Sequence, residues 1–329
     1  MKNHLNDKDP ITPQYNRIMT FGVFGLVCAL FYYVQKDVTR QVDTIQAQAA
    51  ETKLAQQKKA DPNEEVEIIC PRSKYESANF YFSQYYEDYI LDYVFSDVPK
   101  GIYIDVGAAD PKRLSVTYSF YEKGWRGINI DPVPSYAKMY EKERPEDLFL
   151  NIGISNEAGS LSFYECGTGC GLSTFDKSGA EQVTKDRGIQ FTEVKLPVIT
   201  MKTVLTEHPQ KEVHFVNVDV EGWERQVLEG FDFNIVKPEV FIIESTLPNT
   251  TTPTQHLWEG HLFQNGYVLA MTDFLNRYYI NKQSKYLKKY LRRFSYIDMC
   301  VRQSKLRRGV FPTSPWERFS PPPVAKPAQ

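Results

Sequence analysis

Residues 101–110, Gly-Ile-Tyr-Ile-Asp-Val-Gly-Ala-Ala-Asp, form the stretch that decides the fold. Apolar, β-branched and aromatic residues lead up to Asp105, and Gly107 follows two positions later. This pattern predicts a buried strand that ends in a turn where the backbone approaches a ligand closely. In an open α/β sheet, ligands bind beyond the carboxyl ends of the strands, where this interpretation places Asp105.

A second apolar run, residues 127–130, ends at Asp131, and the residues in between, 112–123, are compatible with a helix. A strand, a helix and a second strand with an acid at its tip are typical of a nucleotide-ribose site. A carboxylate there can accept hydrogen bonds from both ribose hydroxyls. The alternative is an α/β domain whose strands happen to end in Asp, a residue that favours turns.

The same alternation continues along the chain. Further strands are predicted at residues 148–152, 161–164, 194–199, 213–218, 239–243, 267–271 and 278–280, with helices opening near residue 82 and over residues 224–228. Strands alternating with helices predict an α/β fold with a doubly wound, mostly parallel sheet. The strand tips then carry Asp105, Asp131, Asp219 and Glu244 along one edge. Four acids exceed what packing requires at that edge.

The usual phosphate-binding motifs are absent from the sequence. There is no G-x-x-x-x-G-K-[ST] stretch, and Gly107 is followed by Ala108-Ala109-Asp110-Pro111 instead of the G-x-G-x-x-G spacing. An acid at the tip of the first strand would also repel a pyrophosphate. S-adenosylmethionine has an ammonium, a sulfonium and a ribose but no phosphate, so it suits Asp105 and Asp131.

Four segments, taken together, resemble the FkbM family of S-adenosylmethionine-dependent methyltransferases. They are Phe-Ser-Gln at 82–84, Tyr-Ile-Asp-Val-Gly-Ala at 103–108, Gly-Trp-Arg-Gly-Ile-Asn-Ile-Asp-Pro at 124–132 and Val-Asp-Val-Glu-Gly at 218–222. The resemblance covers about residues 80–245. It implies a class I methyltransferase fold, which is Rossmann-like, and usually methylation of a hydroxyl oxygen on a sugar or natural product.

The resemblance also implies cofactor contacts. Asp105, Gly107 and Ala108 fall on the family's methionine-binding motif, Asp131 and Pro132 on its ribose acid, and Gln84 on the segment before the first strand. The sequence departs from the pattern at Ala109 and Pro111, where glycines are frequent, and Asp131 stands where Glu is commoner. These departures affect the shape of the cofactor loop.

Methylation of a hydroxyl calls for a nearby base or a metal ion, because a hydroxyl is a poor nucleophile at neutral pH. Asp219, Glu221 and Glu244 are the candidate catalytic residues, and the same three could hold a divalent cation through oxygen ligands. A helix cap is the alternative role for Glu221. His256 and His261 are further candidate bases, although surface histidines are the favoured interpretation. The expected acceptor is a glycan, a glycolipid or a related metabolite, with residues 165–192 forming part of its pocket.

Composition narrows the class of protein. The chain has 329 residues, of which 42% are hydrophobic and 24% charged, so most of it should be globular. The net charge of −2 argues against nucleic acid as a partner. The five cysteines have no zinc-knuckle context, so a structural metal is not expected. Cys166 and Cys170 flank Gly-Thr-Gly; free thiols are favoured over a bridge, which would need an oxidising compartment.

The N-terminal part contains a candidate membrane anchor. After a polar tail, residues 1–17, the charge-free residues 18–34 end in two tyrosines, as suits a transmembrane helix of roughly 17–25 residues. The run is longer than the apolar region of a signal peptide, about 7–15 residues. A buried soluble helix is the alternative. Residues 35–74 form a polar linker with a weak heptad that would allow self-association, and the methyltransferase domain is expected over residues 75–300.

The C-terminal part is basic. Residues 277–308 contain 11 Lys and Arg against one acid, Asp298. An amphipathic helix there suits an anionic membrane surface or an acidic glycan, and a helix packed on the sheet with a solvated basic face is the alternative. Residues 301–329 are expected to be a basic, then Pro-rich, disordered tail.

The cellular location is predicted from chemistry. S-adenosylmethionine is made in the cytosol, and the basic segment suits a cytoplasmic leaflet, so the domain is expected to face the cytoplasm. The Golgi lumen of a eukaryote is the alternative.

The sequence leaves two other functions as alternatives. A membrane-anchored glycosyltransferase would need a D-x-D-like motif, which Asp219-Val220-Glu221 imitates loosely. A non-catalytic nucleotide-binding scaffold would not need acids at four strand tips.

Overall fold

The computed structural model describes residues 81–248, 250–273 and 275–306 of the chain. The predicted anchor at 18–34, the linker and the Pro-rich tail lie outside these residues, as does the expected domain start near residue 75. Among the helices of the described part, none is long and apolar enough to cross a membrane.

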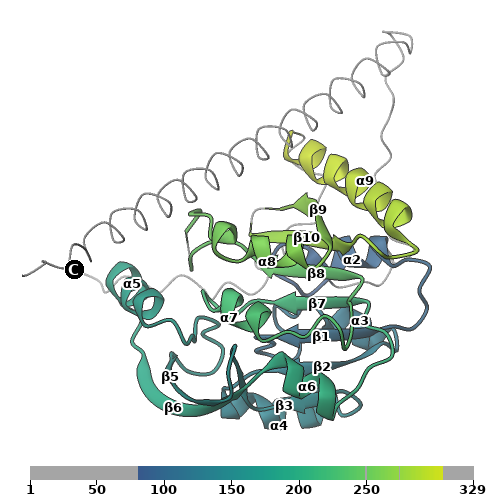
Figure 1. Cartoon of the computed structure of the whole chain (residues 1–329). Helices are drawn as coiled ribbons and strands as arrows, with labels where there is room; N and C mark the ends of the chain where they lie inside the picture. The colour runs from purple at the N-terminus through teal and green to yellow at the C-terminus, as the bar shows by residue number, and fades with distance from the viewer. Residues whose placement is uncertain (1–80, 249, 274, 307–329) are drawn as a thin grey trace, which may run out of the picture. The chain divides into compact units, whose positions relative to one another are not determined.

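A seven-stranded sheet forms the centre of the domain (Figure 1). Its strand order is β3-β2-β1-β7-β8-β10-β9. All neighbours pair in parallel except β10, which runs antiparallel to both β8 and β9. The strands are β1 (Ile102–Val106), β2 (Arg126–Ile130), β3 (Leu148–Leu150), β7 (Phe215–Val218), β8 (Val240–Glu244), β9 (Tyr267–Thr272) and β10 (Asn276–Asn281). The predicted doubly wound, mostly parallel α/β sheet is therefore confirmed.

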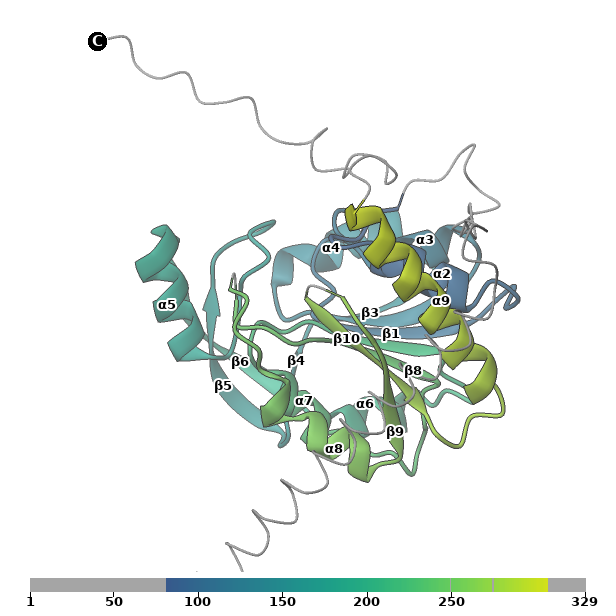
Figure 2. The same ribbon diagram turned by 90° about the horizontal axis from the view of Figure 1, so that it is seen from above.

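Helices cover both faces of this sheet, as Figure 2 shows from above. On one side lie α2 (Glu87–Val94), α3 (Tyr118–Glu122), α4 (Pro134–Glu143) and α9 (Leu287–Leu306); on the other lie α6 (Met201–Glu207), α7 (Glu224–Glu229) and α8 (Glu259–Gln264). The short 3-10 helix η1 (Gln255–Leu257) precedes α8. Because both faces are covered, the central strands read as continuous apolar runs, and every residue of β8 is buried.

The two faces of β1 have different chemistry, because successive side chains of a strand point to opposite sides. Ile104 and Val106 join the aliphatic core under α6, α7 and α8. Tyr103 and Asp105 point the other way. Tyr103 stacks on Phe215, with ring centroids 5.7 Å apart, in an aromatic layer on the side of α2 and α3. Asp105 belongs to a polar layer nearer the carboxyl edge.

A second, three-stranded sheet borders the carboxyl edge of the first. It has the order β4-β6-β5 and consists of β4 (Gly153–Ile154), β5 (Gly159–Glu165) and β6 (Thr192–Ile199). Helix α5 (Lys177–Arg187) lies between β5 and β6 in the chain, capped by Asp176, whose carboxylate accepts from the amides of Ser178 and Gly179. The strand predicted at 148–152 is confirmed for residues 148–150, which form β3, and the next strand, β4, belongs to the small sheet.

The helix predicted over residues 112–123 is also mostly wrong, since only Tyr118–Glu122 is helical. Turns occupy the preceding residues. The Asp110 carboxylate accepts from the amides of Lys112 and Arg113, and Leu114 has φ 63°, which interrupts a helix. The helix expected to open near residue 82 begins only at Glu87. The Ser83 hydroxyl accepts from the Asp88 amide at 3.3 Å.

The basic helix α9 packs against the domain. Tyr290, Phe294 and Ile297 are fully buried, and Lys289 and Arg293 pair with Asp97. Other basic side chains of this segment are exposed: Lys282, Lys285, Lys288 and Arg292. This arrangement matches the alternative of a packed helix with a solvated basic face. The side of α9 that carries Tyr290, Phe294 and Ile297 faces the domain, whereas Met299 is exposed.

Arg144, at the end of α4, organises the polar layer beneath the sheet edge. It forms an ion pair with Asp147 at 2.7 Å, and both side chains are fully buried. The guanidinium also donates to the Tyr103 hydroxyl at 2.8 Å and to Thr117 Oγ1 and Asn129 Oδ1 at 3.0 Å each. One side chain therefore joins β1, β2, α4 and the segment before α3.

We expect Arg144→Met to lower the free energy of unfolding by about 3–5 kcal/mol, because it leaves the Asp147 carboxylate buried without its partner. Urea denaturation of the full chain measures this loss. The control is Arg225→Ala, which removes the exposed pair with Glu229 on α7 and should cost no more than about 1 kcal/mol. Equal losses in the two variants would show that the buried network is dispensable.

Candidate active site

A cavity opens where the carboxyl ends of β1, β2 and β7 meet the small sheet. Its walls come from the loops that follow these strands, from β4 and β5, and from the segment that precedes α5. The lining residues are Val106, Gly107, Ala109, Ile130, Asp131, Pro132, Val133, Tyr136, Ile152, Ile154, Phe163, Gly171, Ser173, Thr174, Phe175, Asp219, Val220, Glu221 and Trp223. The cavity lies at the edge that the strand pattern predicts for a ligand.

Gly107 allows the loops after β1 and β7 to touch. Its φ is +85°, and a Cβ at this position would overlap the carbonyl oxygen of Asp219. The Gly107 amide donates to the Ile130 carbonyl at 2.9 Å, and the Asp219 amide donates to the Val106 carbonyl at 3.0 Å. The sequence therefore needs glycine here both for its backbone conformation and for space. These contacts fix the three strand tips relative to one another.

Asp131 lies at the tip of β2 and is buried, yet it lines the cavity. Its Oδ2 accepts from the Ala109 amide at 3.0 Å, and its Oδ1 accepts from the Val133 amide at 2.9 Å. Burial raises the pKa of this carboxyl to about 7. The two amide bonds hold the carboxylate still, and each oxygen keeps a lone pair for a ligand hydroxyl.

The predicted cofactor residues separate into two groups. Gly107, Asp131 and Pro132 line the cavity, whereas Asp105, Ala108 and Gln84 do not. The physical reasons differ. Asp105 accepts from Thr117 Oγ1 and from Asn217 Nδ2, both at 2.9 Å, so both of its oxygens serve to join neighbouring elements. Ala108 packs among buried aromatic residues, and Gln84 is exposed before α2. Direct cofactor contacts by these three stay predictions.

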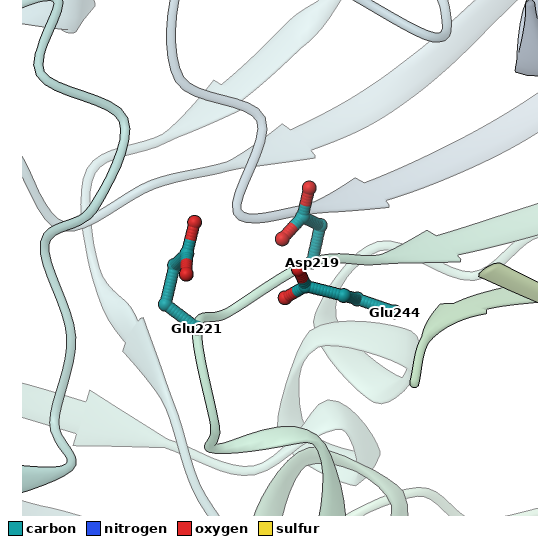
Figure 3. A group of neighbouring side chains, drawn as sticks. All are labelled: Asp219, Glu221 and Glu244. Carbon is teal, nitrogen blue, oxygen red and sulfur yellow. The ribbon is translucent and has the colours of Figure 1, made fainter. Parts of the chain in front are cut away.

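The three predicted catalytic acids come together. Asp219 and Glu221 follow β7, Glu244 ends β8, and ligand oxygens of all three lie within 4.8 Å of one another (Figure 3). Glu244 is only 4% exposed, and its Oε2 has no hydrogen-bond partner; the same is true of Glu221 Oε2. Glu221 has φ 53°, a conformation unusual for a residue other than glycine. Strand ends far apart in sequence thus form one acidic cluster.

Burial raises the pKa of each acid in this cluster, and repulsion between the acids raises it further at Glu221 and Glu244. Burial is the largest cause for all three, and the negative charge of Asp219 adds to it at both Glu221 and Glu244. A fourth acid, Glu224, lies behind them and accepts from the Gly222 amide at 2.9 Å; burial raises its pKa to about 7. Sequence analysis missed Glu224, because an acid in the first turn of a helix resembles an ordinary helix start.

The segment between β5 and α5 closes one side of the cavity. The prediction of free thiols is wrong here, because Cys166 and Cys170 form a disulfide, with Cα atoms 5.9 Å apart. Within this ring, Gly169 accepts from Arg113 at 2.6 Å and donates to the Tyr136 hydroxyl at 3.1 Å. Further on, Thr174 Oγ1 donates to the Glu221 carbonyl at 2.8 Å. The sequence indicated only that this stretch borders a pocket.

Neither candidate histidine lines the cavity. His256 is exposed, and His261 packs beside Phe233 with ring centroids 5.7 Å apart. The favoured interpretation of surface histidines agrees with the exposure of His256, whereas His261 is half-buried.

Comparison with known proteins identifies the family. The family model described as "Methyltransferase FkbM domain" matches residues 105–275, more than half of the chain. The chain belongs to the FkbM methyltransferase family. S-adenosyl-L-methionine is the cofactor that this membership implies, and the glycosyltransferase alternative falls away. Among curated proteins, a search found no match.

Solved structures similar to this FkbM-family chain are also methyltransferases. A TehB-like SAM-dependent methyltransferase from Corynebacterium glutamicum has 9% identity, covers 63% of this chain and 91% of its own, and gives a TM-score of 0.35. Magnesium protoporphyrin IX methyltransferase from Synechocystis, with bound SAM, has 11% identity, coverage of 59% and 77%, and a TM-score of 0.33. A Burkholderia thailandensis 1,6-didemethyltoxoflavin-N1-methyltransferase has 12% identity, coverage of 59% and 74%, and a TM-score of 0.31.

The cavity of this FkbM-family domain has the chemistry that S-adenosylmethionine needs. Asp131 would offer acceptors to ribose hydroxyls, and Ile130, Ile152 and Phe163 would offer apolar surface to a flat base. The missing side chain at Gly107 lets the loops after β1 and β7 meet at the wall of the cavity. These residues would hold the cofactor.

We expect Asp131→Ala to raise the dissociation constant for S-adenosylmethionine roughly 10- to 150-fold, because charge-assisted hydrogen bonds worth about 1.5–3 kcal/mol are lost. Isothermal titration calorimetry of the full chain measures this. Asp232→Ala is the matched control, since it removes an Asp that accepts from a backbone amide in a turn away from the cavity. Unchanged affinity of the Asp131 variant would refute the ribose assignment.

Proposed function

We propose that this methyltransferase transfers the methyl group of S-adenosylmethionine to a hydroxyl oxygen of a glycan, a glycolipid or a related polyhydroxylated metabolite. The observation that carries the proposal is the acidic cluster. Asp219 and Glu221 line the same cavity as the cofactor residues Gly107 and Asp131. A site for methyl donation and a set of groups that can activate a hydroxyl therefore share one space.

The residues divide the reaction between them. When bound, S-adenosylmethionine supplies an electrophilic methyl group, whose bond to sulfur breaks with its electron pair returning to the sulfur. Asp219 and Glu221 are placed to accept the proton that the attacking hydroxyl loses. Burial raises the pKa of Asp219 to about 6, which brings this carboxylate closer to the pH at which a general base works best. Most of the remaining rate gain comes from holding the two reactants in line.

Segments that follow Glu221 and Glu244 in the chain carry buried polar atoms that support an acceptor with several hydroxyls; of these side chains, Trp223 lines the cavity. Five side chains carry buried atoms without a hydrogen-bond partner: Trp223 Nε1, Gln226 Oε1, Thr246 Oγ1, Thr254 Oγ1 and Gln255 Oε1. They belong to α7 and its start, the stretch after β8, and η1 with its cap. The Thr254 amide donates to the Ser245 carbonyl at 2.8 Å, which brings the last two segments together. Such atoms are costly unless a ligand or water completes them.

We also propose that residues 18–34 anchor the chain in a membrane with the domain on the oxidising, lumenal side. The sequence favoured the cytoplasm, because of cofactor supply and the basic segment 277–308. Two features support the other side. The Cys166–Cys170 disulfide is typical of oxidising compartments. Tyr290, Phe294 and Ile297, apolar residues of α9 that insertion into a cytoplasmic leaflet would need, are buried against the domain.

Glu221→Gln and Asp219→Asn should each slow methyl transfer by roughly 10²- to 10⁴-fold, the usual contribution of a general base. Transfer from radiolabelled S-adenosylmethionine to extracted glycolipids and glycans identifies the acceptor and then measures turnover. Cofactor affinity should stay close to wild type. Glu229→Gln, on the exposed face of α7, is the control and should keep full activity. If neither acid affects turnover, proton removal occurs elsewhere.

The lumenal location predicts that two thiols stay hidden until reduction. Cells expressing the full chain are lysed in a polymer-linked maleimide, with and without prior reduction, and the mass shifts are compared. Reduction should add two more labels in the wild type than in a Cys166→Ser, Cys170→Ser double variant. Labelling of both cysteines without reduction would place the domain in a reducing compartment.

A further inference from the structure

We propose that Asp219, Glu221 and Glu244 bind one divalent cation, Mg²⁺, Mn²⁺ or Ca²⁺, at the active-site edge. The inference deepens the proposed function, because the cation would lie where the acceptor hydroxyl has to be activated. Cation binding itself can be measured without any acceptor. Three oxygen ligands and no sulfur or imidazole among them favour these hard metals over zinc or copper.

The spacing of the three carboxylates suits a single ion. Their ligand oxygens lie within 4.8 Å of one another. Oxygen ligands bind Mg²⁺ at about 2.1 Å and Ca²⁺ at about 2.4 Å, so two ligands on opposite sides of an ion are roughly 4.2–4.8 Å apart. Figure 3 shows the Glu244 carboxylate directed toward Asp219, with the Glu221 carboxylate facing the same space. Small side-chain adjustments would bring all three into one coordination sphere.

Unsatisfied oxygens give independent support for a bound ligand. Glu244 is only 4% exposed, and its Oε2 has no hydrogen-bond partner. Glu221 Oε2 is likewise buried and without a partner. A buried carboxylate oxygen without a donor is costly, so it calls for a ligand. No Lys, Arg or His is present among the residues that line the cavity. Arg187 is exposed, and its charge lowers the pKa of Glu221 by less than the neighbouring Asp219 and Glu224 raise it.

Backbone contacts hold the ligand-bearing loop in place. The Asp219 amide donates to the Val106 carbonyl at 3.0 Å, and Thr174 Oγ1 donates to the Glu221 carbonyl at 2.8 Å. Glu244 is the last residue of β8, whose residues are all buried. The three carboxylates are therefore presented by rigid strand ends and a loop fixed on two sides. Such preorganisation favours specific binding of an ion.

The chemistry of methyl transfer to oxygen gives a further reason for a cation. As the hydroxyl loses its proton, negative charge develops on the attacking oxygen. Three carboxylates around that oxygen would repel the charge, and one of them suffices as a base. A cation between them reverses this effect and lowers the pKa of a hydroxyl that it binds. The proton then passes to a carboxylate or to water, while oxygen forms the new bond to the methyl carbon.

Terbium luminescence provides a direct test. Tb³⁺ binds Ca²⁺-type oxygen sites, and Trp223 lines the same cavity as Asp219 and Glu221, close enough to transfer excitation energy. The full chain, freed of metal by a chelator, is titrated with Tb³⁺ and then with Mn²⁺ as competitor. We expect Tb³⁺ to bind at one saturable site, from which Mn²⁺ displaces it. Trp223→Phe should lose the sensitised emission but keep Mn²⁺ binding by calorimetry.

Substitutions separate this site from adventitious binding. Glu244→Gln and Asp219→Asn, which keep the shape of each side chain, should weaken Mn²⁺ binding by at least about tenfold. Glu229→Gln, on the exposed face of α7, should not change it. Thermal melts check that each variant is folded. No saturable binding, or equal affinity in the folded Glu244 and Asp219 variants, would overturn the proposal.

The failures of the two proposals can be told apart. If the site binds Mn²⁺ but no hydroxyl acceptor is methylated, the cation site stands and the proposed acceptor class fails. If methyl transfer to a hydroxyl is insensitive to chelator, yet Glu244→Gln slows it, the cation site fails and the carboxylates act as the base. Loss of transfer on chelation with recovery on Mn²⁺ supports both.

Discussion

The buried ion pair between Arg144 and Asp147 is the interaction on which the sheet edge depends. Around it, Tyr103, Asn129 and Thr117 bring together β1, β2 and the segment before α3. Thr117 in turn donates to Asp105, and Asn217 donates to the same carboxylate from β7. The chain of contacts thus runs from a helix end to the three central strands. A charge buried this deeply tolerates little movement, because each donor and acceptor depends on its partner.

This polar layer gives Asp105 a role different from the expected one. An acid at the tip of a first strand reads as a cofactor ligand, yet both of its oxygens are used within the protein. Asp131 and the backbone near Gly107 line the cavity instead. Asp105 still serves the site, since it fixes the strand ends from which the cofactor loops emerge. Residues that hold the strand ends in place are as necessary to such a site as residues that contact the ligand.

Sequence patterns predicted the strands well, because hydrophobic runs ending in acids mark buried strands and their tips. They brought Asp131, Asp219, Glu221 and Glu244 to one edge correctly. They failed where the decisive contact is non-local or depends on φ. Leu114 has a positive φ that no propensity indicates, so the helix predicted over residues 112–123 starts too early. Nothing in the sequence distinguishes Arg144 and Asp147 from surface charges near a helix end, because their partners lie on β1 and β2.

The closed segment before α5 has a consequence for turnover. It is bonded to the first cofactor loop and α4 through Arg113 and Tyr136, and to the acid-bearing loop through Thr174 and Glu221. A cofactor in the cavity would lie against this segment. Any outward movement of this wall would break those hydrogen bonds, and the Cys166–Cys170 ring limits how far the chain between the two cysteines can extend. Exchange of spent cofactor for fresh past this wall would then depend on its opening and not on methyl transfer.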